Sequence, residues 1–166
     1  MLIDAGLIIN SDSSVAFHFD QAPAGLDDLF SQEVHIRQVV TDAVARHYLG
    51  RIYITLDISC TYDTVCARCL RDLTRTVTQH SEQCFARVGT EVEDQDIIAY
   101  SGNEIDLSDT VADSIFAAVP VRDLCSEDCR GICPHCGIDL NRGTCHCQES
   151  QVDPRLAGLA RLLEQD

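Results

Sequence analysis

The amino-acid sequence predicts an α+β fold, in which an antiparallel sheet is accompanied by a covering helix, a cysteine-rich metal-binding loop and a C-terminal helix. Three observations lead to this prediction. Residues 33–87 show the period-two alternation of β-strands with no helical pattern of sufficient length between them, which favours an antiparallel sheet over βαβ units. Residues 106–119 carry an apolar stripe of helical period. Six of the ten cysteines fall within residues 125–147, a segment too poor in aliphatic residues to fold by burial alone.

The 166 residues are expected to form one domain overall, in three parts. These are a β-rich body with the covering helix at residues 1–121, a cysteine-rich zinc segment at residues 122–148 and a C-terminal helix at residues 149–166. Hydrophobic residues make up 45% of the chain, which is enough for a core. Because the chain has no tryptophan and few aromatic residues, this core is expected to be mostly aliphatic.

The first 31 residues contain two short apolar runs and a loop. Leu2 to Asn10 is apolar enough for a strand, and Val15 to Phe19 is a second run of this kind. A loop is expected after them, with one turn of helix at Leu26 to Phe30.

Residues 33–87 are expected to form the main strands of the sheet. The alternation begins at Val34, Ile36, Gln38 and Val40, and a turn is expected at Tyr48-Leu49-Gly50-Arg51. Residues 51–58 alternate cleanly, with Ile52, Ile54, Leu56 and Ile58 on one face. Residues 74–87 form another β-prone run.

Two helices are expected after the sheet. Residues 89–104 first form a solvated acidic loop around the short apolar piece 97–100. The covering helix then spans residues 106–119, with Asp106 or Ser108 as its cap and Pro120 as its end. The terminal helix begins with Asp153 as its cap and Pro154 at its first position.

The cysteines of residues 125–147 are spaced for a metal ion. Cys133 and Cys136 have the two-residue separation that lets both thiolates face one tetrahedral ion. Cys145 and Cys147 are too close in sequence for an unstrained disulfide. Cys133, Cys136, Cys145 and Cys147 therefore form a first expected zinc site, and disulfides or free thiols are the alternative.

A second pair of cysteines with the same spacing, Cys66 and Cys69, falls between the last two strands. A possible second site consists of Cys66, Cys69, Cys125 and Cys129, and it would pin the cysteine segment to the sheet. A single site that draws on Cys66, Cys69, Cys133 and Cys136 is the rival arrangement. For Cys66 and Cys69, buried free thiols or a redox pair are further alternatives. Cys60 and Cys84 lie within strand patterns and are expected to act as small apolar side chains.

The charge of the chain limits its partners. It has 27 acidic residues against 12 basic ones, all arginine, and a formal net charge of −15. Such a chain is a poor non-specific binder of nucleic acid, because it cannot replace phosphate counterions, but it attracts basic partners. We find no secretory signal and no stretch long enough to span a membrane. A cytoplasmic location is therefore expected, and a reducing compartment favours metal thiolates over disulfides.

The sequence does not favour an enzyme. It contains no nucleophile with a convincing base, no phosphate-binding loop and no dinucleotide fingerprint. The strongest enzymatic alternative is a thiol-disulfide redox protein that uses Cys133-Pro134-His135-Cys136. In such proteins the first cysteine lies at a helix N-terminus, which lowers its pKa. Gly137 and Asn141-Arg142-Gly143 argue against a following helix here.

The cysteine segment resembles that of the YceD family, whose name refers to large ribosomal RNA subunit accumulation. The matching residues are Cys125, Cys129, Gly131-Ile132-Cys133-Pro134, Cys136-Gly137, Leu140-Asn141, Cys145 and Cys147. Cys66-Ala67-Arg68-Cys69-Leu70 and Asp153-Pro154-Arg155-Leu156 also match. The resemblance is strong from about residue 50 to the end, and it implies a role in assembly of the large ribosomal subunit without supplying a catalytic residue.

Charge and resemblance together predict a non-catalytic assembly factor with structural zinc. Its expected partner is a basic protein of the large ribosomal subunit, or the pre-ribosomal particle that contains such proteins. The alternative is direct RNA binding by arginines near the metal loops, namely Arg68, Arg71, Arg130 and Arg142.

Overall fold

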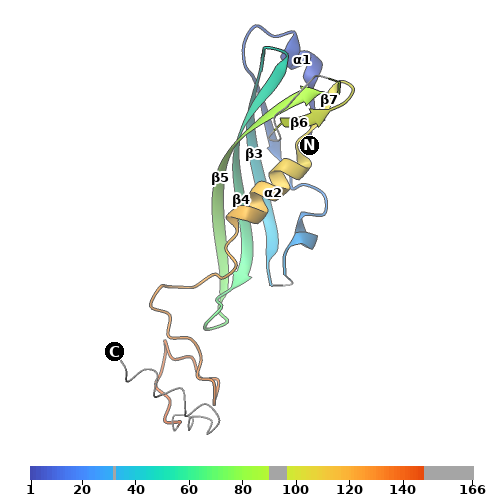
Figure 1. The fold of residues 1–166 in the computed structure, drawn as a ribbon. Helices are drawn as coiled ribbons and strands as arrows, with labels where there is room; N and C mark the ends of the chain where they lie inside the picture. Colours follow the sequence, from blue (N-terminus) through green and yellow to red (C-terminus); the bar gives the residue numbers. More distant parts are fainter. Residues whose placement is uncertain (32, 90–96, 148–166) are drawn as a thin grey trace, which may run out of the picture.

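The structure, a computed structural model, describes residues 1–31, 33–89 and 97–147. Its fold is α+β, mostly strand with few helices, and it is built on a long twisted sheet (Figure 1). The sheet has the order β2-β3-β4-β5-β6. Its strands are β2 (Val15–Asp20), β3 (His35–Tyr48), β4 (Arg51–Val65), β5 (Asp72–Arg87) and β6 (Ile97–Tyr100). A small second sheet pairs β1 (Leu2–Asp4) with β7 (Glu104–Asp106).

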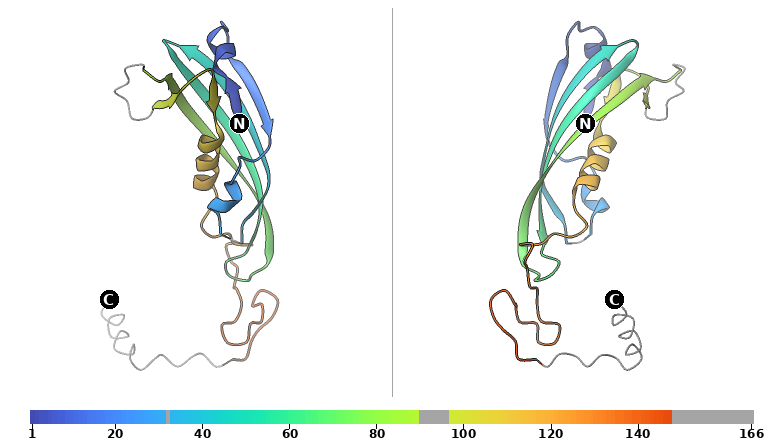
Figure 2. Two further views of the ribbon diagram at one scale, coloured as in Figure 1. Left: turned by 90° about the vertical axis from the view of Figure 1, so that its right-hand side faces the viewer. Right: turned by 60° about the vertical axis from the view of Figure 1, so that its left-hand side comes forward.

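The core lies on one face of the sheet. β4 alternates as predicted over residues 51–58 and continues the alternation to Val65, and it buries Ile52, Ile54, Leu56, Ile58, Cys60 and Tyr62. Three short helical elements are present in the described residues: α1 (Ala5–Ile9), the 3-10 helix η1 (Leu26–Leu29) and α2 (Ser108–Ala118). Figure 2 shows α2 and η1 on the same side of the sheet, and the rings of Phe30 and Phe116 pack together with centroids 5.7 Å apart.

The helix α2 starts two residues later than the predicted 106–119. Leu107 is its N-cap residue and makes no side-chain cap, but the Asp106 carboxylate accepts a hydrogen bond from the Ser108 N–H at 2.9 Å. Val111 and Ile115 are buried in the same core as the β4 aliphatics. The predicted C-terminal helix at 149–166 lies outside the described residues. Within the described residues, no helix has the length and apolar character needed to cross a membrane.

The predicted strand at Leu2 to Asn10 is wrong beyond Asp4. The Asp4 side chain accepts hydrogen bonds from the N–H groups of Gly6 and Leu7, at 2.7 and 3.4 Å, and so caps a helix instead. Ala5 and Ile8 then point to the core with helical spacing. A short apolar run fits either period, and the cap decides between them.

The sheet is mixed rather than purely antiparallel. Residues 97–100, predicted as part of a loop, form β6, which pairs with β5 in parallel from Cys84↔Ile97 to Arg87↔Tyr100. The pairing gives the end of β5 a partner for its outer backbone groups, and such groups must be satisfied somewhere. The pairs β3-β4 and β4-β5 are antiparallel, as predicted for residues 33–87, and β2 also pairs with β3 in antiparallel orientation.

The predicted alternation of β3 holds only at its start. The register shifts between Ile36 and Gln38, and beyond this irregularity Val39, Thr41, Ala43 and Ala45 face the core. An extra residue in one strand reverses which side chains face inward, because the period of a strand is two. Val40, which was placed on the face of Val34, therefore lies on the opposite face.

The tight turn between β3 and β4 generates a stability prediction. Leu49 and Gly50 occupy its central positions with φ of 48° and 75°, and Leu49 is 80% exposed. A leucine with positive φ is strained, whereas asparagine tolerates this conformation. We expect Leu49→Asn to raise the free energy of unfolding in urea by about 1 kcal/mol. Leu29→Asn, the same change at an exposed position with ordinary φ, should give no such gain, and equal effects would contradict the explanation.

Candidate metal centres

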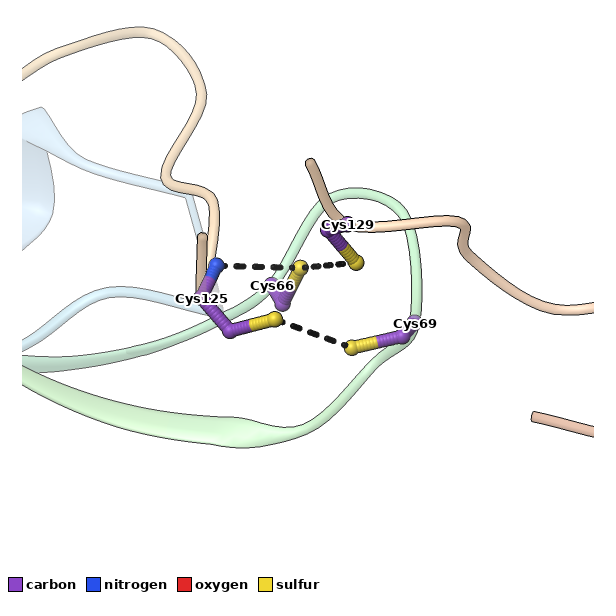
Figure 3. A group of neighbouring side chains, drawn as sticks. All are labelled: Cys66, Cys69, Cys125 and Cys129. Carbon is purple, nitrogen blue, oxygen red and sulfur yellow. Dashed lines mark hydrogen bonds between the residues drawn. The ribbon is translucent and has the colours of Figure 1, made fainter. Parts of the chain in front are cut away.

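Four cysteines meet where the β4-β5 hairpin approaches the chain that leaves α2 (Figure 3). We call Cys66, Cys69, Cys125 and Cys129 the hairpin tetrad. Their sulfur atoms all lie within 4.8 Å of one another, with Cys66 and Cys129 at 3.8 Å and Cys69 and Cys125 at 3.6 Å. Three of the four are buried, Cys66 completely. Segments more than fifty residues apart in the sequence therefore supply one compact group of thiols.

The hairpin loop is shaped by backbone hydrogen bonds around its two cysteines. The Cys66 N–H donates to the Arg71 carbonyl at 2.8 Å, and the Leu70 N–H donates to the Cys66 carbonyl at 2.9 Å. Leu70 takes a φ of 58° to close the turn. This tight turn brings the two thiols of the Cys-x-x-Cys pair to the same side.

The other half of the hairpin tetrad is held by the residues just before it. The Tyr62 hydroxyl donates to the Asp123 carboxylate at 3.0 Å, and the Ala67 N–H donates to the Asp123 carbonyl at 2.9 Å. Arg75 donates to the Leu124 carbonyl. Burial, together with the hydrogen bond to Asp123, raises the pKa of the Tyr62 hydroxyl, which therefore stays protonated as a donor. Cys125 is thus delivered to the hairpin by contacts with β4, β5 and their loop.

Arg68 fastens the two halves of the hairpin tetrad to each other. Its guanidinium donates to the carbonyls of Glu127 and Cys129, at 3.1 and 2.9 Å. Its own carbonyl accepts the Ile132 N–H at 3.1 Å. Gly131 passes so close that a Cβ there would lie 2.9 Å from the Arg68 carbonyl oxygen.

A second group of four sulfurs lies further along the chain. We call Cys133, Cys136, Cys145 and Cys147 the loop tetrad, and their sulfur atoms also lie within 4.8 Å of one another. The Cys133 N–H donates to the Ile138 carbonyl and the Gly137 N–H to the Cys133 carbonyl, both at 2.9 Å. Gly137 has a φ of 74°. Cys133 is buried, whereas Cys136 and Cys147 are exposed.

Backbone N–H groups favour the thiolate form of one cysteine in each tetrad. Burial opposes ionisation of Cys66, but N–H groups of Cys125, Arg68 and Cys69 lower the pKa of its thiol to about 6. N–H groups of Cys136 and His135 likewise lower the pKa of Cys133 to about 6. N–H donors aimed at sulfur stabilise a thiolate, which is the form that binds metal.

One other thiol in each tetrad, Cys125 and Cys147, resists ionisation. The hydrogen bond with Cys129 and burial raise the pKa of Cys125 to about 12, and the hydrogen bond with Cys136 and burial raise that of Cys147 to about 12. Negative charge on one sulfur opposes negative charge on its neighbours. A bound cation would remove this opposition, so the electrostatics of both tetrads suit a metal ion.

The sulfur separations fit a tetrahedral ion. Four thiolates about 2.3 Å from a Zn²⁺ ion lie about 3.8 Å from one another. The two sulfur–sulfur distances in the hairpin tetrad, 3.6 and 3.8 Å, are close to this value and far from the roughly 2.05 Å of a disulfide. All ten cysteines are free thiols. The two cysteine tetrads are therefore compatible with metal binding.

The sequence left open whether the cysteines form two groups or one group that joins Cys66 and Cys69 to Cys133 and Cys136. The structure pairs Cys66 and Cys69 with Cys125 and Cys129, and it does not group them with the loop tetrad. No helix begins at Cys133 within the described residues, so the geometry that activates a redox Cys-x-x-Cys pair is absent from that part. Cys60 is fully buried in the sheet core, where burial and then the charge of Asp27 raise its pKa to about 11, and Cys84 is half-buried.

Three of the four arginines considered for RNA binding are engaged within the molecule. Arg68 holds the hairpin tetrad, as described. Arg71 and Arg142 both approach the Asp139 carboxylate, at 3.7 and 3.6 Å. Hydrogen bonds from Asn141, and then these two arginines, hold the pKa of Asp139 below its usual value. Arg130 is exposed, and its backbone N–H donates to the Asn141 side chain at 2.8 Å.

Sequence reasoning missed the residues that support the tetrads. Asp123, Tyr62 and Arg75 were not singled out, and neither was Asp139 as an anchor for two arginines. Asp and Asn are common in turns, so their presence in a turn-rich segment carries little signal. The one available hint was Asn141, which belongs to the residues shared with the family pattern.

Comparison with known proteins decides the family. Residues 54–163 match the family described as large ribosomal RNA subunit accumulation protein YceD. The chain belongs to the YceD family. The matched region includes both cysteine tetrads and begins within β4.

Curated relatives share about a third of the aligned residues with this YceD-family chain. An uncharacterized protein of Mycobacterium tuberculosis is 33% identical over 102 residues, which are 59% of this chain and 49% of that protein. The uncharacterized protein YlbN of Bacillus subtilis is 32% identical over 103 residues, 61% of this chain and 60% of YlbN. The chain thus spans about half the length of the mycobacterial relative.

A plant relative has a functional name. It is large ribosomal RNA subunit accumulation protein YCED homolog 1, chloroplastic, of Arabidopsis thaliana, which is 32% identical over 62 residues, 37% of this chain and 19% of that protein. No solved structure matches the chain.

Two glycines of the cysteine segment allow a matched test of the contact with Arg68. Gly131 and Gly137 both have a φ of 74°, but only Gly131 lies against backbone. Gly137→Ala should cost about 1–2 kcal/mol of local stability through its positive φ alone. Gly131→Ala should cost more and should abolish hydrogen-exchange protection of the Ile132 amide, because the added Cβ pushes the chain away from Arg68. Equal protection of this amide in both variants would contradict the proposed close approach.

Proposed function

We propose that this chain is a non-catalytic factor in assembly of the large ribosomal subunit, which acts in the cytoplasm through contact with basic ribosomal proteins and holds structural zinc in both tetrads. The family description supports the pathway. One observation supports the mode of contact: the negative charge of the chain is concentrated in residues 1–63 and 73–119 and is balanced around the tetrads.

The balance is visible when the chain is divided at the tetrads. We call residues 64–72 and 120–147 the cysteine lobe. It contains five arginines and five acidic residues, namely Arg68, Arg71, Arg122, Arg130 and Arg142 with Asp72, Asp123, Glu127, Asp128 and Asp139. Residues 1–63 and 73–119 contain 18 acidic residues and five arginines. Zinc held by four thiolates adds further negative charge to the lobe, so neither part offers the excess of positive charge that RNA requires.

The open face of the sheet carries a row of charged side chains across its strands. Asp42 on β3 lies directly opposite Asp57 on β4 in the register. Their side chains are 63% and 70% exposed, and each accepts a hydrogen bond from a histidine at 2.7 Å, Asp42 from His18 and Asp57 from His80. Like charges directly opposite each other destabilise a sheet. The two histidines, whose pKa values these hydrogen bonds raise, offset part of this repulsion, and the exposed carboxylates also suit a cationic partner.

The tetrads are suited to a structural role. Four thiolates close the coordination sphere of Zn²⁺ and leave no position for a reactive water. The lobe has only a small apolar cluster, in which three of the tetrad cysteines are themselves the buried members and Leu73, Leu124, Cys125 and Ile132 pack against them. Metal binding would therefore supply stability that burial does not.

Zinc content tests the first half of the proposal. Protein purified without added metal should contain close to two zinc equivalents by elemental analysis, and a chelator should increase hydrogen exchange in residues 122–147 before the sheet opens. Cys133→Ser should remove roughly one equivalent and cost more stability than Cys84→Ser, the control outside both tetrads. Less than about half an equivalent in the wild type, with unoxidised cysteines, would reject structural zinc.

Binding to basic proteins tests the second half. Purified protein should bind basic large-subunit proteins at low salt, bind more weakly at high salt, and show no binding to ribosomal RNA fragments. Asp42→Asn with Asp57→Asn should weaken the protein contact roughly two- to thirty-fold without lowering the unfolding midpoint. Asp109→Asn with Asp113→Asn, an equal change of charge on α2, is the control.

The result with RNA distinguishes the proposal from its alternative. Tight RNA binding that is lost when Arg130 and Arg142 are replaced would favour direct RNA recognition by the cysteine lobe. Equal loss of protein binding in the two pairs of Asp→Asn variants would mean that net charge, rather than the open face of the sheet, attracts the partner.

A further inference from the structure

We propose that the two tetrads are coupled, so that each binds its metal more tightly when the other is loaded, and that Asn141 is a positioning residue through which this coupling passes. The inference rests on the proposed metal binding and adds to it a thermodynamic link between the sites. It follows from contacts that join the loop tetrad to the hairpin loop.

The first contact is through the short stretch that separates the tetrads. Only residues 130–132 lie between Cys129 of the hairpin tetrad and Cys133 of the loop tetrad. On one side the Ile132 N–H donates to the Arg68 carbonyl at 3.1 Å, within the hairpin loop. On the other side the Gly131 carbonyl accepts the Leu140 N–H at 2.9 Å, and Ile132 forms a β-bridge with Asp139. The stretch is thus held by both sites at once.

The second contact is a hydrogen bond from a side-chain amide to a sulfur of the hairpin tetrad. The amide belongs to residues 133–147, which we call the loop segment. Asn141 lies between Cys136 and Cys145 in the sequence, so the loop tetrad determines its place. Its Nδ2 lies 3.5 Å from Cys129 Sγ and 2.7 Å from Asp139 Oδ1, and donates to both. Its Oδ1 accepts the Arg130 N–H at 2.8 Å. A donor on a metal-bound thiolate lowers the energy of the charged sulfur and orients it.

The third contact is electrostatic. The Asp139 carboxylate lies 3.7 Å from the guanidinium of Arg71, which follows Cys69 by two residues in the hairpin loop. Asp139 is in turn held by the Asn141 backbone N–H at 2.9 Å. The loop segment therefore meets the hairpin tetrad and its surroundings through the Arg68 carbonyl, the Cys129 sulfur and the ion pair with Arg71.

These contacts imply a shared cost of ordering. A metal in the hairpin tetrad fixes Arg68, Arg71 and Cys129, and so presents ordered partners to the loop segment. A metal in the loop tetrad fixes Asp139 and Asn141, and so presents ordered partners to the hairpin. The second metal then pays less conformational entropy than the first, and the factor by which affinity rises must be the same in both directions.

The coupling factor can be measured without assigning affinities to sites in the wild type. Co²⁺ is titrated against a competing chelator in the wild type, in Cys145→Ser with Cys147→Ser, and in Cys66→Ser with Cys69→Ser. The product of the two wild-type association constants, divided by the product of the two single-site constants, equals the coupling factor. We expect a factor of about 5–150. A factor of one, with two equivalents bound by the wild type, would overturn the coupling but leave the metal sites in place.

Asn141→Asp tests the residue while all eight cysteines of the two tetrads stay intact. Aspartate keeps the acceptor for the Arg130 N–H but replaces the donor to Cys129 with an oxygen. We expect both Co²⁺ association constants of the variant to be at least about five-fold lower than those of the wild type. The thiolate-to-cobalt charge-transfer band of the hairpin site should also move to longer wavelength, because a sulfur that loses its N–H donor holds its electrons less tightly. Gln79→Glu, the same amide-to-carboxylate change at an exposed position of β5, is the control.

The outcomes are separable. Unchanged constants and an unshifted band in Asn141→Asp would show that Asn141 carries no coupling. Less than half an equivalent of metal in the wild type would reject both the proposed sites and this inference. Far-UV circular dichroism of each variant establishes that the sheet is folded before its metal affinity is compared.

Discussion

The cysteine lobe depends on one constraint, which is that four sulfur atoms from two distant segments must meet around Arg68. The hairpin of β4 and β5 carries one pair, and the chain leaving α2 carries the other. Arg68 donates across the gap to Glu127 and Cys129 and accepts from Ile132, so one hairpin residue binds three residues of the other segment. Without the tetrad, these contacts would have to order a lobe that has almost no apolar core.

The molecule uses two different sources of stability along its length. At one end, β3, β4 and α2 bury a continuous aliphatic core, which includes Leu56, Val111 and Ile115. At the other end, backbone hydrogen bonds and thiols replace apolar side chains. Tyr62 and Asp123 lie where the two regions meet, and their hydrogen bond connects the last residue that β4 contributes to the core with the lobe. Because the core needs only one face of the sheet, the other face is free to carry the charges of Asp42 and Asp57.

The residues that match the family are not the same as the residues that build the core. It begins at residue 54, inside β4, and therefore includes the hairpin and both tetrads. The residues before it supply β2 and β3, and with them Val39, Ala43 and Ala45 of the core. The matched part cannot bury its own inner face without these strands. The part that carries the family pattern is thus supported by a part that the pattern does not include.

The sequence by itself determined the features that depend on neighbours in the chain. The alternation of residues 51–58 predicted the central strand, Leu49-Gly50 predicted the tight turn, and the two-residue spacing of Cys66 and Cys69 predicted thiols that face one point. Tertiary structure decided the rest. Asp4, whose carboxylate also accepts a hydrogen bond from the distant Asn103 side chain, caps a helix where a strand was predicted. The irregularity at Ile36 and Gln38 reversed the inward face of β3, and the parallel partner of β5 came from a predicted loop. The ion pairs of Arg71 and Arg142 with Asp139, and the hydrogen bond from Asn141 to Cys129, likewise could not be predicted from the sequence. Local patterns report periods and turns, whereas a bond between residues far apart forms only after the intervening chain has been packed.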